Sequence, residues 1–125
     1  MRDNCCRILI ADDEPIERMV VSKIIQSHFG GEIELSQAVN GREAIEITRK
    51  ENCQVVLLDI SMPGIDGLEA AETIRRENPD CSIIFLTAYD EFDFAKRAIK
   101  VHALDYLVKP WSKEELIAVI DEAVH

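Results

Sequence analysis

Short runs of apolar residues alternate along this chain with longer segments whose apolar positions recur every three or four residues. The clearest run, residues 55–58, consists of four consecutive valines and leucines and is followed by Asp59 and by turn residues. Such a continuous aliphatic run is typical of a strand buried on both faces, as parallel strands are between layers of helices. By this criterion, or by apolar and polar alternation, the predicted strands are residues 7–11, 32–39, 55–58, 82–87 and 105–108.

Helical periodicity fills the intervals between these strands. Asn40 and Gly41 introduce one helix, and Ser112 with Glu115 forms the S-x-x-E capping box that introduces the last one. The other predicted helices are residues 16–29, 67–78 and 90–101. Five strands that alternate with five helices predict an α/β fold, a single doubly wound five-stranded parallel sheet covered by helices on both sides.

The length and charge of the chain narrow the possible functions. The 125 residues suffice for one domain, which we expect to span residues 1–125. No apolar run approaches the roughly 18 residues of a membrane span, so we expect a soluble, cytoplasmic protein that does not bind membranes. The formal net charge of −10 disfavours direct binding to nucleic acid, which requires clustered Lys and Arg. Proteins and cations are the expected partners.

The four cysteines, Cys5, Cys6, Cys53 and Cys81, show neither a C-x-x-C spacing nor a nearby pair of histidines. A zinc site or a thioredoxin-type redox motif is therefore not indicated, and reduced buried thiols are expected. Three of the cysteines precede predicted strands, so a parallel sheet would gather them near its amino-terminal edge. A functional cluster there is an alternative to simple packing.

Polar side chains follow four of the five predicted strands: Asp12 with Asp13, Asp59, Thr87 and Lys109. The carboxyl ends of parallel strands meet at the edge of the sheet where ligands bind. Asp59 alone would also be explained as a cap of the following loop. Three carboxylates at one edge repel one another unless a cation is present, and an all-oxygen site indicates Mg²⁺. A carboxylate beside Mg²⁺ and a lysine can accept a phosphoryl group as an acyl phosphate.

These motifs resemble, in this order and spacing, the receiver domains of two-component response regulators, and the resemblance covers essentially the whole chain. The residues that carry it are Ala11-Asp12-Asp13-Glu14, Leu58-Asp59-Ile60-Ser61-Met62-Pro63-Gly64-Ile65-Asp66-Gly67, Leu86-Thr87-Ala88 and Asp105-Tyr106-Leu107-Val108-Lys109-Pro110. The resemblance implies the flavodoxin-like strand order 2-1-3-4-5. It also implies a signalling domain that is not an enzyme and that promotes only its own phosphorylation and dephosphorylation.

The resemblance further implies a role for each residue of the site. Asp59 would accept a phosphoryl group from a phosphohistidine of a sensor histidine kinase. Asp13 and Asp59 would bind Mg²⁺ directly, together with the main-chain carbonyl of Ser61, and Asp12 would act mainly through water. Lys109 would pair with the phosphoryl oxygens.

Two residues would transmit the signal. Thr87 would form a hydrogen bond with a phosphoryl oxygen, and Tyr106 would turn inward as Thr87 moves. The alternative for Tyr106 is a half-buried tyrosine of a strand without a switching role. The Lys109–Pro110 peptide bond resembles the cis bond of the family, and X-Pro bonds adopt cis at low cost.

Residues 87–100 are most similar to receivers that are joined to AraC-type helix-turn-helix output domains. No DNA-binding segment follows within these 125 residues, so we expect contact with DNA only through an output domain absent from this chain. Phosphorylation would then control transcription through the face formed by the fourth helix, the fifth strand and the fifth helix. The alternative is a stand-alone receiver that acts only by docking to other proteins.

The helix predicted at residues 90–101 carries more apolar surface than one contact with a sheet requires. Its apolar residues form two stripes, Phe92, Ala95 and Ile99 on one side and Phe94, Ala98 and Val101 on another. One stripe is expected to mediate a homodimer on phosphorylation, which Phe94→Glu or Val101→Glu should prevent. Burial of both stripes between the sheet and a neighbouring helix is the alternative.

Two other classes of protein share parts of this pattern. A flavodoxin-like FMN carrier has the same strand order, but the first loop, with Asp12, Asp13 and Glu14, would repel the phosphate of FMN. A dehalogenase-type phosphatase also combines an Asp nucleophile with Mg²⁺, Thr and Lys. Resemblance to that family requires a second Asp two places after the nucleophile, where this chain has Ser61.

Overall fold

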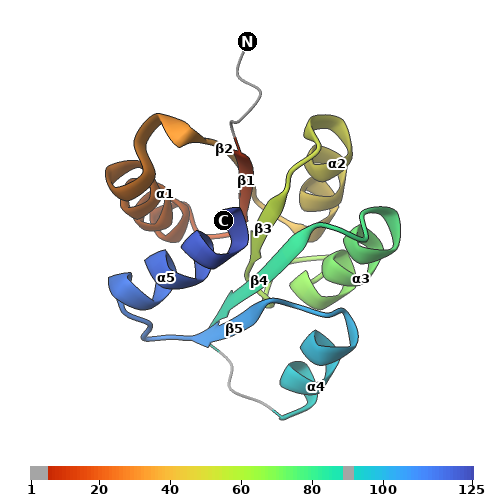
Figure 1. The fold of residues 1–125 in the computed structure, drawn as a ribbon. Helices are drawn as coiled ribbons and strands as arrows, with labels where there is room; N and C mark the ends of the chain where they lie inside the picture. The colour runs from red at the N-terminus through yellow and green to blue at the C-terminus, as the bar shows by residue number, and fades with distance from the viewer. Residues whose placement is uncertain (1–5, 89–91) are drawn as a thin grey trace.

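The computed structural model describes residues 6–88 and 92–125, which form one sheet with helices on both faces (Figure 1). The strands are β1 (Cys6–Ala11), β2 (Ile33–Ala38), β3 (Val55–Leu58), β4 (Ser82–Thr87) and β5 (Asp105–Val108). The helices are α1 (Pro15–Phe29), the short η1 (Gly30–Glu32), α2 (Gly41–Glu51), α3 (Gly67–Glu77), α4 (Phe92–Lys100) and α5 (Lys113–Val124).

All five strands are parallel and lie in the order β2-β1-β3-β4-β5, which confirms the predicted doubly wound α/β fold. One face of the sheet is covered by α1 and α5, and the other by α2, α3 and α4 (Figure 1). Along β3, Val56 and Leu58 belong to the core on the α2 and α3 side, whereas Val55 and Leu57 belong to the core on the α1 and α5 side. The continuous apolar run of β3 therefore reflects burial on both faces of the sheet.

Reciprocal capping boxes fix the beginnings of α3 and α5. Asp66 accepts a hydrogen bond from the backbone N–H of Glu69, and the side chain of Glu69 accepts one in return from the backbone of Asp66. The same exchange joins Ser112 and Glu115 at α5, which confirms the box predicted from the sequence. These caps satisfy backbone donors that a helix leaves unpaired in its first turn.

Only some of the apolar residues of α1 are buried. Val21, Ile25 and Phe29 pack into the core, whereas Ile16 and Met19 are 69% and 53% exposed. Apolar residues occur on more than one side of α1, so periodicity alone does not identify the face that meets the sheet. The exposed residues lie in the first part of the helix, close to the end of β1.

The structure corrects the assignment of α4. The stripe that contains Phe94 and Val101 faces the core on the α2 and α3 side, with Val101 buried and Phe94 partly buried. Among the side chains of α4 that the structure describes, Ile99 is an exposed large apolar residue, at 74%. The expectation that Phe94 and Val101 form a partner surface is therefore wrong, because the rotation of the helix about its own axis turns them inward. Residues 89–91 and the side chain of Phe92 lie outside the described part of the chain.

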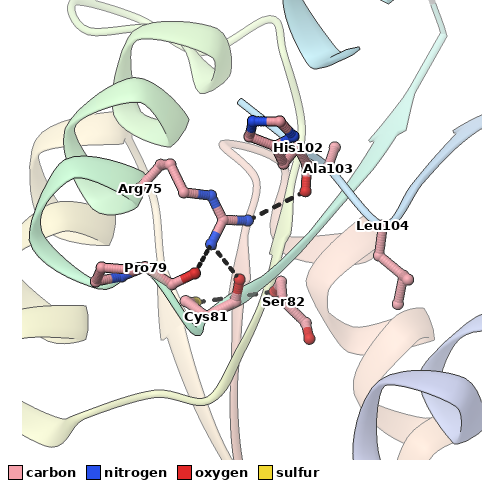
Figure 2. A pocket seen from close by; sticks show the side chains of 7 residues that line it. All are labelled: Arg75, Pro79, Cys81, Ser82, His102, Ala103 and Leu104. Carbon is pink, nitrogen blue, oxygen red and sulfur yellow. Dashed lines mark hydrogen bonds between the residues drawn. The ribbon is translucent and has the colours of Figure 1, made fainter. Parts of the chain in front are cut away.

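Arg75 of α3 ties together two loops at the amino-terminal edge of the sheet (Figure 2). Its guanidinium donates hydrogen bonds to the main-chain oxygens of Pro79 at 2.8 Å and Cys81 at 2.7 Å, before β4, and to those of Val101 at 2.7 Å and His102 at 3.2 Å, before β5. Arg75 also lines a cavity of about 390 Å³ there. Because carbonyl oxygens already occupy its donors, Arg75 has a structural role rather than that of an anion-binding residue.

The cysteines that the structure describes lie at this same edge, as the positions before the strands predicted. Cys6 is the first residue of β1, Cys53 and Cys81 are free thiols, and the Sγ of Cys81 lies 3.6 Å from the main-chain oxygen of Cys53. Burial raises the pKa of Cys53 to about 12 and that of Cys81 to about 11. Both thiols are therefore protonated at neutral pH and are poor nucleophiles. Cys5 lies outside the described residues.

Candidate functional site

The hydrogen bonds of the sheet continue past the ends of β1 and β3 and bring two carboxylates together. The backbone N–H of Asp59 donates to the oxygen of Ala11 at 3.0 Å, and that of Asp12 donates to the oxygen of Ala38 at 3.1 Å. Oxygen atoms of Asp12, Asp13 and Asp59 all lie within 4.8 Å of one another. The structure thus gathers the three predicted acidic residues at the carboxyl edge of the sheet.

The three carboxylates differ in their surroundings. Asp12 is 7% exposed and Asp59 is 9% exposed, whereas Asp13 is exposed. Burial, followed by the charge of Asp12, raises the pKa of Asp59 to about 6, although Lys109 opposes the shift. Burial also raises the pKa of Asp12, against the backbone hydrogen bond that its Oδ1 accepts from Glu14 at 2.9 Å. Ionising both Asp12 and Asp59 costs free energy when no cation is bound, because like charges at close range repel each other.

The donor atoms of this cluster fit a hard divalent cation. Three carboxylates supply only oxygen ligands, as Mg²⁺ requires. The main-chain N–H of Ser61 donates to Oδ1 of Asp59 at 3.3 Å, which places Ser61 directly beside the cluster. The triad therefore supplies the carboxylate ligands that suit a Mg²⁺ site.

Gly67 holds the loop that follows Asp59 in place. Its backbone N–H donates to the oxygen of Ile60 at 2.9 Å, which closes the loop onto the end of β3. A Cβ atom on Gly67 would lie 2.1 Å from the main-chain oxygen of Asp59. Gly41 makes a similar approach, since its Cβ would lie 2.1 Å from the oxygen of Ile65 in the same loop. Two glycines therefore allow the close backbone packing that positions Asp59.

Lys109 reaches the same edge from the end of β5. Its backbone N–H donates to the oxygen of Thr87 at 2.8 Å, and the Lys109–Pro110 bond is cis, as predicted. The side chain of Lys109 forms an ion pair with Glu17 of α1. Burial by itself would lower the pKa of Lys109, but Glu17 and the nearby carboxylates of Asp12 and Asp59 raise it. Lys109 is therefore fully charged at neutral pH.

Thr87 is the last residue of β4 and is completely buried. Although Thr87 ends its strand at the edge where the carboxylates lie, its side chain is not exposed, because β4 lies between β3 and β5 and helices cover both faces of the sheet. Tyr106 of β5 is half-buried, with its ring centroid 6.0 Å from that of Phe85. This position agrees with the packing alternative for Tyr106, and its role as a switch stays a prediction.

The pattern along the sequence did not single out Glu17 or Arg18 and included Gly67 only as the last residue of a motif, yet all three residues shape the site. Glu17 pairs with Lys109, Arg18 donates through Nη1 to the main-chain oxygen of Asp12 at 2.7 Å, and Gly67 contacts the backbone of Asp59. For Glu17 the sequence offers only its position in the first turn of a helix that starts at Pro15. Nothing in the sequence joins it to Lys109.

Comparison with known proteins places this geometry in a family. The family model described as the response regulator receiver domain matches residues 8–121. The chain belongs to the response regulator receiver domain family. As expected from the sequence, such a receiver domain is a signalling module and not a conventional enzyme. Among residues 6–88 and 92–125, no helix is both long enough and apolar enough to cross a membrane.

Several relatives of this receiver domain belong to longer proteins. It is 41% identical, over 93% of its length, to the positive alginate biosynthesis regulatory protein of Pseudomonas aeruginosa, of which it spans 46%. It is 34% identical, over 94% of its length, to the uncharacterized transcriptional regulatory protein YesN of Bacillus subtilis, of which it spans 32%. The chain thus corresponds to less than half of either protein.

Solved receiver structures show the same fold. The REC domain of AraT, a response regulator from Geobacillus stearothermophilus, superimposes with a TM-score of 0.83 at 36% identity, covering 95% of this chain and 92% of that one. A CheY-like receiver domain protein from Methanospirillum hungatei gives a TM-score of 0.89 at 26% identity, covering 96% of this chain and 94% of that one. The sheet order predicted for this chain is therefore that of a CheY-like receiver.

Proposed function

We propose that this receiver domain is a phosphorylation-dependent switch that accepts a phosphoryl group from a sensor histidine kinase on Asp59, with Mg²⁺. The observation that carries the proposal is the cluster of Asp12, Asp13 and Asp59, whose carboxylate oxygens lie within 4.8 Å of one another beside Lys109. A purely structural cluster of three carboxylates would be unfavourable because the groups repel one another. Sensor histidine kinases would donate the phosphoryl group in the cytoplasm, so this role would place the domain there.

Each residue of the cluster has a place in this reaction. Asp12, Asp13, Asp59 and the main-chain carbonyl of Ser61 would hold Mg²⁺, which neutralises charge on the transferred group. An oxygen of Asp59 forms the new bond to phosphorus as the bond between phosphorus and the donor histidine nitrogen breaks. The electron pair of the broken bond stays on that nitrogen, and the histidine ring takes up a proton, so that it leaves as neutral imidazole.

Two further residues would act on the transferred group. Lys109 would pair with the oxygens of the phosphoryl group, and its raised pKa keeps it charged for this role. The hydroxyl of Thr87 would donate a hydrogen bond to one of them. Because Thr87 is buried, its movement would be felt by the side chains packed around β4 and β5, among them Tyr106.

Labelling with a small phosphodonor tests the proposal directly. With acetyl phosphate and Mg²⁺, we expect mass spectrometry to show one added phosphoryl group, located on Asp59 and labile to hydroxylamine. In excess EDTA the label should disappear, because the carboxylates then repel the donor. Trp111, the single tryptophan, lies two residues after Lys109 and offers a fluorescence signal for Mg²⁺ binding. Label on another residue, or full labelling in EDTA, would refute the assignment.

We further infer that the domain controls a DNA-binding output domain of the AraC type. Similarity to YesN, a transcriptional regulatory protein, and to the REC domain of AraT supports this choice. The chain is also 37% identical to PdtaR of Mycobacterium tuberculosis, which is likewise described as a transcriptional regulatory protein. A stand-alone receiver that acts by docking to proteins is the alternative.

The exposed side of α4, together with β5 and α5, is the surface through which we propose that the phosphorylated domain dimerises. Ile99 is 74% exposed there, and Leu104 in the loop before β5 is 37% exposed. Large apolar side chains at such exposure gain free energy when a partner covers them. Contact through this surface would transmit the movement of Thr87 and Lys109 on phosphorylation to a second copy of the domain.

Sedimentation velocity with beryllofluoride and Mg²⁺, a stable mimic of the phosphoryl group, tests this surface. We expect the mimic to promote dimers and Ile99→Glu to weaken them at least about tenfold, because a charge would be buried in the interface. Met19→Glu, at an exposed site of α1 on the other side of the sheet, is the matched control and should still dimerise. A monomer at high concentration with the mimic bound, or dimers that Ile99→Glu does not affect, would disprove the proposal.

A further inference from the structure

The ion pair between Lys109 and Glu17 links the end of β5 to the first turn of α1. Within the described part of the chain, it is the single ion pair that Lys109 makes within 4.0 Å. The two side chains are 29% and 28% exposed, so both are largely withdrawn from water. The ammonium of Lys109 therefore has a fixed partner outside the cluster of Asp12, Asp13 and Asp59.

The position of Glu17 is fixed by the start of α1. The helix begins at Pro15, and Glu17 lies in its first turn, where the positive end of the helix dipole favours a carboxylate. The neighbouring Arg18 donates to the oxygen of Asp12 at 2.7 Å and to Oε1 of Gln37 at 3.0 Å. These contacts attach the first turn of α1 to the loop that carries Asp12, so Glu17 cannot easily follow Lys109 if Lys109 moves.

The carboxylates of Glu17, Asp12 and Asp59 all interact with the single positive charge of Lys109. Glu17, Asp12 and Asp59 all raise the pKa of Lys109, and the charge of Glu17 acts against the ionisation of Asp12. A phosphoryl group on Asp59 adds negative charge next to Lys109, whose ammonium is a compact point charge on a flexible stem and carries a single positive charge. The arriving group must therefore compete with Glu17.

We propose that Glu17 is a positioning residue that holds Lys109 at the rim of the site in the unphosphorylated state and competes with the phosphoryl group for it. The inference rests on the proposed function, in which Asp59 accepts the phosphoryl group. Glu17 stabilises the unphosphorylated form by this ion pair, and its release of Lys109 accompanies phosphorylation. The residue thereby sets how readily the domain is switched on.

Glu17→Gln tests the proposal, because it keeps the size of the side chain and removes its charge. We expect labelling of Asp59 by acetyl phosphate with Mg²⁺ to become about three- to tenfold faster, the range that a partly buried ion pair provides. The matched control is Glu14→Gln, which removes the same charge from an exposed position just before α1. Its effect on the rate should be smaller, since Glu14 does not pair with Lys109.

Variants in a second background separate competition for Lys109 from the general repulsion between the acidic site and the phosphodonor. In a Lys109→Ala background, Glu17→Gln should change the labelling rate no more than Glu14→Gln does. Urea unfolding of each variant shows whether the fold is kept, and Glu17→Ala should act in the same direction as Glu17→Gln. A merely structural role for Glu17 would lower stability without accelerating labelling.

Failure of the proposed function and failure of the role of Glu17 give different results. A wild-type protein that is not labelled on Asp59 would refute the proposed function. If instead the wild type is labelled on Asp59, Glu17→Gln could be labelled more slowly than the wild type, at the same rate, or at the same rate as Glu14→Gln. Any of these results would overturn only the role of Glu17. An acceleration that persists in full without Lys109 would also overturn it.

Discussion

Asp59→Asn is expected to abolish labelling by a phosphodonor and, at the same time, to stabilise the metal-free protein. At pH 7 in EDTA, its free energy of unfolding should exceed that of the wild type by about 1–3 kcal/mol. The reason is that Asp59 is ionised in a buried place beside Asp12, which raises its pKa from 3.8 to about 6. An asparagine of the same shape carries no charge to desolvate.

The gain in stability should depend on pH in a defined direction. Between about pH 4 and pH 6 the folded wild type binds more protons than the unfolded chain, because the pKa of Asp59 is higher in the folded state. The free energy of unfolding of the wild type therefore falls as the pH rises through this window. The difference from Asp59→Asn should be nearly absent at pH 4 and complete above about pH 7.

Urea unfolding in EDTA across this pH range measures the effect. Asp80→Asn, an exposed aspartate after α3 at the opposite edge of the sheet, is the control and should match the wild type. Mg²⁺ should stabilise the wild type, because the bound cation neutralises the three carboxylates. It should not stabilise Asp59→Asn, which lacks one of them. A variant that is less stable than the wild type at pH 7 in EDTA would show that Asp59 is a structural residue.

Gly67→Ala should destabilise the fold by about 3 kcal/mol or more, the upper range for overpacking. Helix propensity alone would favour alanine here by at most about 1 kcal/mol, the value for a helix interior, since Gly67 is the first residue of α3. The steric term wins, since the added Cβ would lie 2.1 Å from the oxygen of Asp59, far inside van der Waals contact. Relief of this clash would move the backbone of Asp59, so labelling should fall as well.

Gly64→Ala in the same loop is the control, because nothing lies within 4 Å of its Cβ position. Its φ of +74° makes an alanine cost about 1–2 kcal/mol, without a change at Asp59. Thermal or urea unfolding gives the stabilities, and acetyl phosphate labelling gives the activity. If Gly67→Ala proved as stable as the wild type, the contact between α3 and Asp59 would be looser than the structure indicates.

Much of the fold and part of the site follow from local patterns in the sequence. The run at residues 55–58 and the capping box at Ser112 identify β3 and the start of α5, because burial on two faces and helix capping each require particular residues at short spacing. Strand alternation with helices then places Asp12, Asp13 and Asp59 at one edge. The clustering of these carboxylates was therefore predictable before any distance was known.

Only the tertiary structure decided the remaining features of the site. Glu17 meets Lys109 across 92 positions of the chain (109 − 17), and no local pattern specifies that contact. The burial of Thr87 and the inward rotation of Phe94 likewise depend on how helices pack on the sheet. Periodicity indicates that a helix has an apolar side, but the rotation of α1 and α4 about their axes is fixed by contacts with distant residues. The raised pKa of Asp59 has the same origin, since desolvation and neighbouring charge exist only once the chain has folded.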